Sequence, residues 1–128
     1  MKRSTFFLIT AILAFLFGGL MLLAAPNAAD GFGLSPSPEV YFLLRFLGGM
    51  LVSMGIVNLV VRSHEDSATL KAVLLMNIAV HVLGMLNDIM GAAGGVLPFG
   101  KVVPGFITHF FVGIGSAFYY VKMKLQPK

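Results

Sequence analysis

Residues 6–25 read FFLITAILAFLFGGLMLLAA, twenty residues without one charge, and this stretch decides the fold class. A bilayer core about 30 Å thick is crossed by roughly 20 apolar helical residues. Pro26 follows directly and disfavours continuation of the same helix. Phe6–Ala25 therefore predicts a membrane-spanning helix. It is longer than the roughly 7–15 apolar residues of a signal peptide, so we expect it to be retained as a span.

The composition of the whole chain supports a membrane protein. Of 128 residues, 58% are hydrophobic and 11% are charged, whereas soluble domains carry about 25% charged residues. So few charges exclude a soluble enzyme domain and a disordered tail. The net charge of +4 comes from basic residues that stand singly or in pairs, without the clustered stripe of a nucleic-acid-binding face. The chain has no cysteine, which excludes disulfides and thiol redox chemistry.

Three further apolar runs follow the first, and the four runs predict an all-α protein with a single domain. Short connections between consecutive spans favour an antiparallel four-transmembrane-helix bundle. The three later runs are Val40–Val61, Ala68–Met90 and Val102–Val121. We expect an irregular segment at Pro26–Pro38, a polar turn at Arg62–Ser67 and a glycine-rich loop at Gly91–Lys101.

The cationic residues predict the orientation of the bundle. Seven of them flank one side of the spans: Lys2, Arg3, Arg62, Lys71, Lys122, Lys124 and Lys128. The other side has Lys101, together with Arg45 if that side chain reaches outward. Since cytoplasmic loops carry an excess of Lys and Arg, we expect both termini in the cytoplasm and, in a bacterium, a plasma or inner membrane location.

Four ionisable residues inside the runs are the candidate functional residues: Arg45, His81, Asp88 and His109. Such residues within a span are costly and mark a site or a partner by default. At 1.5 Å rise per residue, all four fall in the outer half of the membrane. Three interpretations stay open. Arg45 reaches the headgroups while Asp88 ends a helix in interfacial water; or the two form a structural ion pair; or the cluster binds a ligand or proton.

The two histidines allow a more specific alternative, which is ligation of a haem. His81, Gly84 and Asp88 share one helix face, and Gly84 leaves space between the polar side chains. His81 and His109 lie at similar depth on consecutive antiparallel helices, as bis-histidine ligation of a b-type haem requires. Phe106, Phe110 and Phe111 would flank the porphyrin. Otherwise each histidine is a hydrogen-bonded packing residue, and no other metal site is predicted.

Small residues predict where the helices pack closely, because helix association in lipid depends on close backbone approach and polar contacts. We expect this role for Gly18, Gly48, Gly49, Gly84 and Gly113, within one chain rather than between chains. Asn58 and Asn77 are expected to form hydrogen bonds between helices.

The stretch Tyr41–Gly49, YFLLRFLGG, with Gly55 six residues later, resembles the second helix of small DoxX-like membrane proteins. That resemblance implies four helices at about this length, and a wider group linked to quinone or thiol-related redox complexes. The chain departs from it in the third helix, where Asn87-Asp88 stands in place of an arginine, and the lack of cysteine excludes thiol chemistry.

These patterns favour a non-enzymatic accessory or hydrophobic-ligand-binding subunit with a polar cluster in its outer half. Its partners would be the lipid bilayer and a second copy or a larger membrane complex. One alternative is a redox component that binds quinone or haem near His81 and His109. Another is an oligomeric transporter or channel, for which Lys71 and Asn77 are the only polar candidates in the inner half. The first span has no acidic residue, which disfavours a proton-coupled drug exporter.

Overall fold

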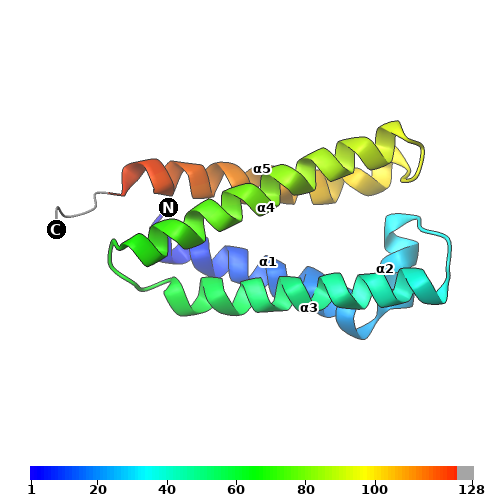
Figure 1. Ribbon diagram of the computed structural model, residues 1–128, viewed down its shortest axis with the longest axis horizontal. Coiled ribbons are helices and arrows are strands. Elements are labelled where there is room, and N and C mark those ends of the chain that lie inside the picture. The colour runs from blue at the N-terminus through cyan, green and yellow to red at the C-terminus, as the bar shows by residue number, and fades with distance from the viewer. Residues whose placement is uncertain (124–128) are drawn as a thin grey trace.

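The computed structural model describes residues 1–123, and over this range helices joined by short connections are the only regular secondary structure (Figure 1). Four of its five helices are long and apolar enough to cross a membrane, which confirms the predicted all-α fold of four spans. Lys124 and Lys128, which contribute to the predicted orientation, lie outside the described residues. The helices are α1 (Arg3–Leu23), α2 (Ala25–Phe32), α3 (Pro38–Val61), α4 (Ala68–Ala93) and α5 (Phe99–Lys122).

Helix α2 replaces most of the irregular segment that was expected at Pro26–Pro38. Pro26 lies in the first turn of α2, where its missing N–H is not needed for helical hydrogen bonding. Gly33 ends the helix in the left-handed conformation with φ 73°, and the Leu34 N–H donates to the carbonyl of Ala29 at 2.9 Å. This is the usual glycine-dependent way to end a helix. The proline therefore begins a new helix as well as marking the end of the first span.

The glycine-rich loop expected at Gly91–Lys101 is shorter in the structure. Helix α4 continues to Ala93 and α5 begins at Phe99, so only residues 94–98 connect them. In an apolar environment each backbone polar group needs an internal partner, which favours continuing both helices toward the connection. The turn itself uses Gly95 with φ 67°.

The four long helices are arranged as two pairs, with α1 against α3 and α4 against α5 (Figure 1). The first pair is held at very close range by two glycines. A Cβ on Gly48 would lie 2.6 Å from the carbonyl oxygen of Gly18, and a Cβ on Gly18 would lie 2.9 Å from that of Gly48. Neighbouring Gly49, expected at a helix contact, instead faces open space, with nothing within 4 Å of its Cβ position. Of the two adjacent glycines, Gly48 is therefore the one at the interface.

The two pairs come together at the end of the bundle that holds Met1 and Met123, which we call the terminal end. An apolar cluster closes the bundle there, and it consists of Phe7, Val61, Leu70, Leu74 and Met123. The side chain of Arg3 binds Asp66 and donates to the carbonyl of His64, which ties α1 to the α3–α4 turn. Toward the opposite end, which holds α2, the two pairs separate (Figure 1).

At this α2 end, the short helix lies against α3 and reaches toward the start of α5. Ala25, Ala28 and Ala29 are buried together with Leu44 of α3. The ammonium group of Lys101 donates to the backbone carbonyl of Asp30 at 3.3 Å. Helix α2 therefore bridges the two pairs at the end where they are farthest apart.

Candidate functional site

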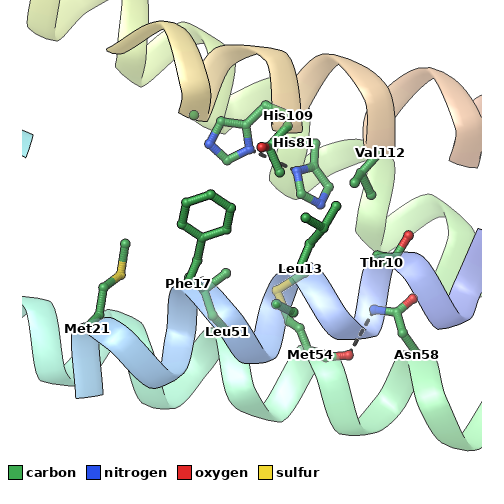
Figure 2. Close-up of a pocket in the computed structure, with 13 residues that line it drawn as sticks. Thr10, Leu13, Phe17, Met21, Leu51, Met54, Asn58, His81, His109 and Val112 are labelled. Atoms are coloured by element: carbon green, nitrogen blue, oxygen red, sulfur yellow. Dashed lines mark hydrogen bonds between the residues drawn. The ribbon is translucent and has the colours of Figure 1, made fainter. Parts of the chain in front are cut away.

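A cavity of about 100 Å³ lies between the two helix pairs (Figure 2). All four long helices contribute to its wall, which is mainly apolar. Its polar groups come from Thr10, Asn58, Thr108 and the two histidines, and both threonine hydroxyls donate to carbonyls of their own helices. The apolar part of the wall is formed by Leu13, Ala14, Phe17, Met21, Leu51, Met54 and Val112, with Gly105 completing it.

His81 of α4 and His109 of α5 meet at the edge of this cavity. Their Nδ1 atoms lie 2.8 Å apart, which is a hydrogen-bond distance. One Nδ1 must carry a hydrogen and the other must be bare, since two bare or two protonated nitrogens cannot form this bond. Figure 2 shows both rings facing Leu13 and Phe17 of α1 across the cavity. His81 is 7% exposed, so its ring is almost entirely inside the bundle.

Asp88 extends this arrangement toward the α2 end. Its Oδ2 atom lies 3.9 Å from Nε2 of His109. The same Oδ2 is buried and has no hydrogen-bond partner among the described residues. We call His81, His109 and Asp88 the polar row. It joins the cavity to a carboxyl group whose hydrogen-bonding capacity is not satisfied.

The polar row fits between α4 and α5 because each of its side chains lies opposite a glycine. His109 fills the space over Gly84, where a Cβ would lie 2.5 Å from its ring. A Cβ on Gly105 would lie 3.4 Å from Asp88 Oδ2, and one on Gly113 would lie 3.5 Å from the Cβ of His81. In α5, Gly105, His109 and Gly113 recur every four residues and so share one face. That spacing is the sequence signal for Gly105, which the sequence interpretation missed.

Arg45 lies away from the polar row. It is on the exposed side of α3, in a shallow open groove formed with Phe46, Gly49, Met50 and Ser53. Since α3 packs on α1 while α4 packs on α5, the structure does not bring Arg45 to Asp88. Within residues 1–123 Arg45 has no ion pair, and the ionic neighbour of Asp88 is His109. An exposed arginine on a spanning helix fits the interpretation in which its side chain reaches the headgroups.

The histidine geometry does not fit a haem between the two rings. Metal–imidazole bonds of about 2 Å would hold the two ligating nitrogens about 4 Å apart, whereas the facing nitrogens here are in direct hydrogen-bond contact at 2.8 Å. The ring planes also have no slot between them, with centroids 5.1 Å apart. Phe110 and Phe111, expected beside a porphyrin, are exposed on the outside of α5, and Phe106 does not line the cavity.

An asparagine pair lies on the terminal side of the histidines. The Asn77 amide donates to Asn58 Oδ1 at 2.7 Å, and the Asn58 amide donates back to Asn77 Oδ1 at 3.4 Å. Both side chains are fully buried, so α3 and α4 are joined here by the interhelical hydrogen bonds that were expected. Beyond this pair lies the apolar cluster of the terminal end, which includes Leu70 and Leu74. In the described part of one chain, the polar row therefore does not continue to the terminal end.

Comparison with known proteins adds no further information: no family model, curated protein or solved structure matches this chain. The DoxX-like resemblance of residues 41–49 stays a prediction.

Proposed function

We propose that this integral membrane protein is a non-catalytic binding subunit, which holds a lipophilic molecule in the cavity between its two helix pairs. The observation that carries the proposal is the cavity wall itself. Apolar side chains from α1, α3 and α5 surround a space whose edge holds the histidine pair. Ligand sites in proteins commonly combine such an apolar lining with a few fixed polar groups. The apolar part would bind the body of the ligand, and His81 and His109 would fix its polar group.

The size of the cavity supports a compact ligand or one end of a longer ligand. An engineered apolar cavity of about 150 Å³ holds benzene, and the space here is about 100 Å³ and partly open. The α1–α3 pair and the α4–α5 pair have little contact with each other compared with the contact inside each pair. Entry from the bilayer between the pairs would therefore disturb less packing than entry within a pair.

The proposed orientation places both termini in the cytoplasm. It is supported by the basic residues at the terminal end, where Lys2, Arg3, Arg62 and Lys122 gather. In this orientation the polar row and α2 belong to the outer half of the membrane. A second copy or a larger membrane complex remains the proposed partner for the exposed faces of the helices.

Native mass spectrometry of the protein released from mild detergent tests the proposed function. We expect a lipophilic molecule to be retained by the unmodified protein. Ala14→Leu places a larger side chain in the cavity, because Ala14 lines its wall. We expect this variant to lose the bound molecule. Ala79→Leu makes the same change on the exposed side of α4 and is expected to keep the bound molecule. Equal retention in both variants, or none in the unmodified protein, would contradict binding in this cavity.

A further inference from the structure

The charge of Asp88 determines which hydrogens the two imidazoles carry. An ionised carboxylate accepts hydrogen bonds and donates none, so the nearby Nε2 of His109 is favoured in its protonated form. A neutral His109 then has a bare Nδ1, and the 2.8 Å contact requires the hydrogen to sit on Nδ1 of His81. A neutral His81 with a hydrogen on Nδ1 has a bare Nε2. No described residue forms a hydrogen bond with this atom.

One added proton reverses this order. If Asp88 is protonated and donates to Nε2 of His109, the hydrogen of His109 moves to its Nδ1. That Nδ1 then donates to Nδ1 of His81, and the hydrogen of His81 moves to Nε2. The row now holds three protons in place of two, with one on each residue. The atom of the row that faces the cavity, His81 Nε2, has changed from a hydrogen-bond acceptor to a donor.

The row is isolated from other titratable groups. On α5 the nearest charged residue toward the α2 end is Lys101, which is engaged with the carbonyl of Asp30. The cavity-lining residues of α1 and α3 include no titratable side chain. Arg45 of α3 lies on the exposed side of that helix. Asp88 is therefore the one described carboxylate next to the histidine pair.

On these grounds we propose that the cavity selects a lipophilic compound with a hydroxyl group, and that protonation of Asp88 weakens its binding. This inference rests on the proposed function and names the class of ligand. With Asp88 ionised, His81 Nε2 accepts a hydrogen bond from the hydroxyl. With Asp88 protonated, Nε2 carries a hydrogen and the hydroxyl loses its acceptor. The 3.9 Å gap between Asp88 and His109 must close for this exchange, and the unpaired Oδ2 of Asp88 is free to make that contact.

Two matched probes test the proposal, 4-propylphenol and its methyl ether 4-propylanisole. They share an apolar body, but only the phenol donates a hydrogen bond, and a phenol ionises only near about pH 10. Binding is measured as the uptake of each probe by nanodiscs that contain the protein, relative to empty nanodiscs. We expect the phenol to bind about tenfold more tightly than the ether at about pH 8, as a single hydrogen bond in a buried site allows. We expect this preference to disappear as the pH falls to about 4.

Two variants distinguish a pH effect that acts through Asp88 from a general effect of low pH on probe binding. Asp88→Asn removes the carboxyl group that starts this exchange, so its preference between the probes is expected to persist to lower pH than in the unmodified protein, until the imidazoles themselves take up protons. Asp30→Asn removes a carboxylate at the same end of the bundle and is expected to retain the pH-dependent loss. Uptake of the ether by the unmodified protein reports an intact cavity across the pH range.

The outcomes distinguish this inference from the proposed function. If neither probe binds, the proposed ligand cavity is contradicted. If both bind equally at about pH 8, or if Asp88→Asn loses its preference at the same pH as the unmodified protein, the cavity stands and the role of the polar row is overturned.

Discussion

The imidazole of His109 lies directly over Gly84, so that a Cβ on this glycine would be 2.5 Å from His109 Cε1. This contact places a ring of α5 against the backbone of α4. It also sets the distance at which His109 reaches His81 on one side and Asp88 on the other. The polar row therefore depends on a residue with no side chain.

Gly84→Ala is expected to displace His109 and destabilise the α4–α5 pair. Overpacking of this kind costs about 1–3 kcal/mol. The measurement is the free energy of unfolding in mixed micelles. Gly113→Ala is the matched control on the same interface, since its Cβ would lie at an ordinary contact distance of 3.5 Å from His81. Equal stability of the two variants would contradict the close contact over Gly84.

Gly48→Ala and Gly49→Ala are expected to differ sharply although the residues are adjacent. A Cβ on Gly48 would meet the backbone of α1 at 2.6 Å, and backbone atoms cannot rotate away as a side chain can. We expect a loss of about 2 kcal/mol or more for Gly48→Ala. Gly49→Ala introduces a methyl group into open space and is expected to be neutral or slightly stabilising, because alanine favours the helix more than glycine does. Thermal unfolding of both variants in detergent tests the difference.

Double-mutant cycles are expected to separate the two proposed partners of Asp88. Arg45→Ala and Asp88→Ala are expected to add within about 0.5 kcal/mol, since the residues lie on different helix pairs. Asp88→Ala and His109→Gln are expected to show a coupling above that value, because their side chains lie in one polar row. A coupling between Arg45 and Asp88 of the same size would place the arginine at the row after all.

The asparagine pair is expected to stabilise the contact between α3 and α4 by an amount that unfolding free energies can measure. Asn58→Ala leaves the buried amide of Asn77 without its partner, at a cost of about 1–2 kcal/mol. Asn58→Leu together with Asn77→Leu removes both amides, and its cost is expected to be smaller than the sum of the two single Leu changes. Unfolding free energies of the three Leu variants check this, and strict additivity would show that the amides act independently.

Much of the fold followed from the sequence alone. Four long apolar runs can satisfy their backbone groups in a bilayer only as helices, so the number of spans was fixed by hydropathy. Helix α2 was missed because Asn27, Asp30 and Gly31 interrupt its apolar residues and because Pro26 was interpreted only as the end of the first span. The sequence also identified His81, Asp88 and His109 as a cluster, because ionisable residues inside apolar runs are few.

Which residues touch was decided only by the tertiary structure. Hydropathy predicts that Arg45 and Asp88 lie at the same end of the bundle, but the depth of a residue carries no information on its direction around the helix axis or on the neighbouring helix. Packing supplied that information: the fit of Gly18 against Gly48 pairs α3 with α1, and the fit of His109 over Gly84 pairs α5 with α4. As a result Asp88 faces His109, and Arg45 is left on the exposed side of its helix.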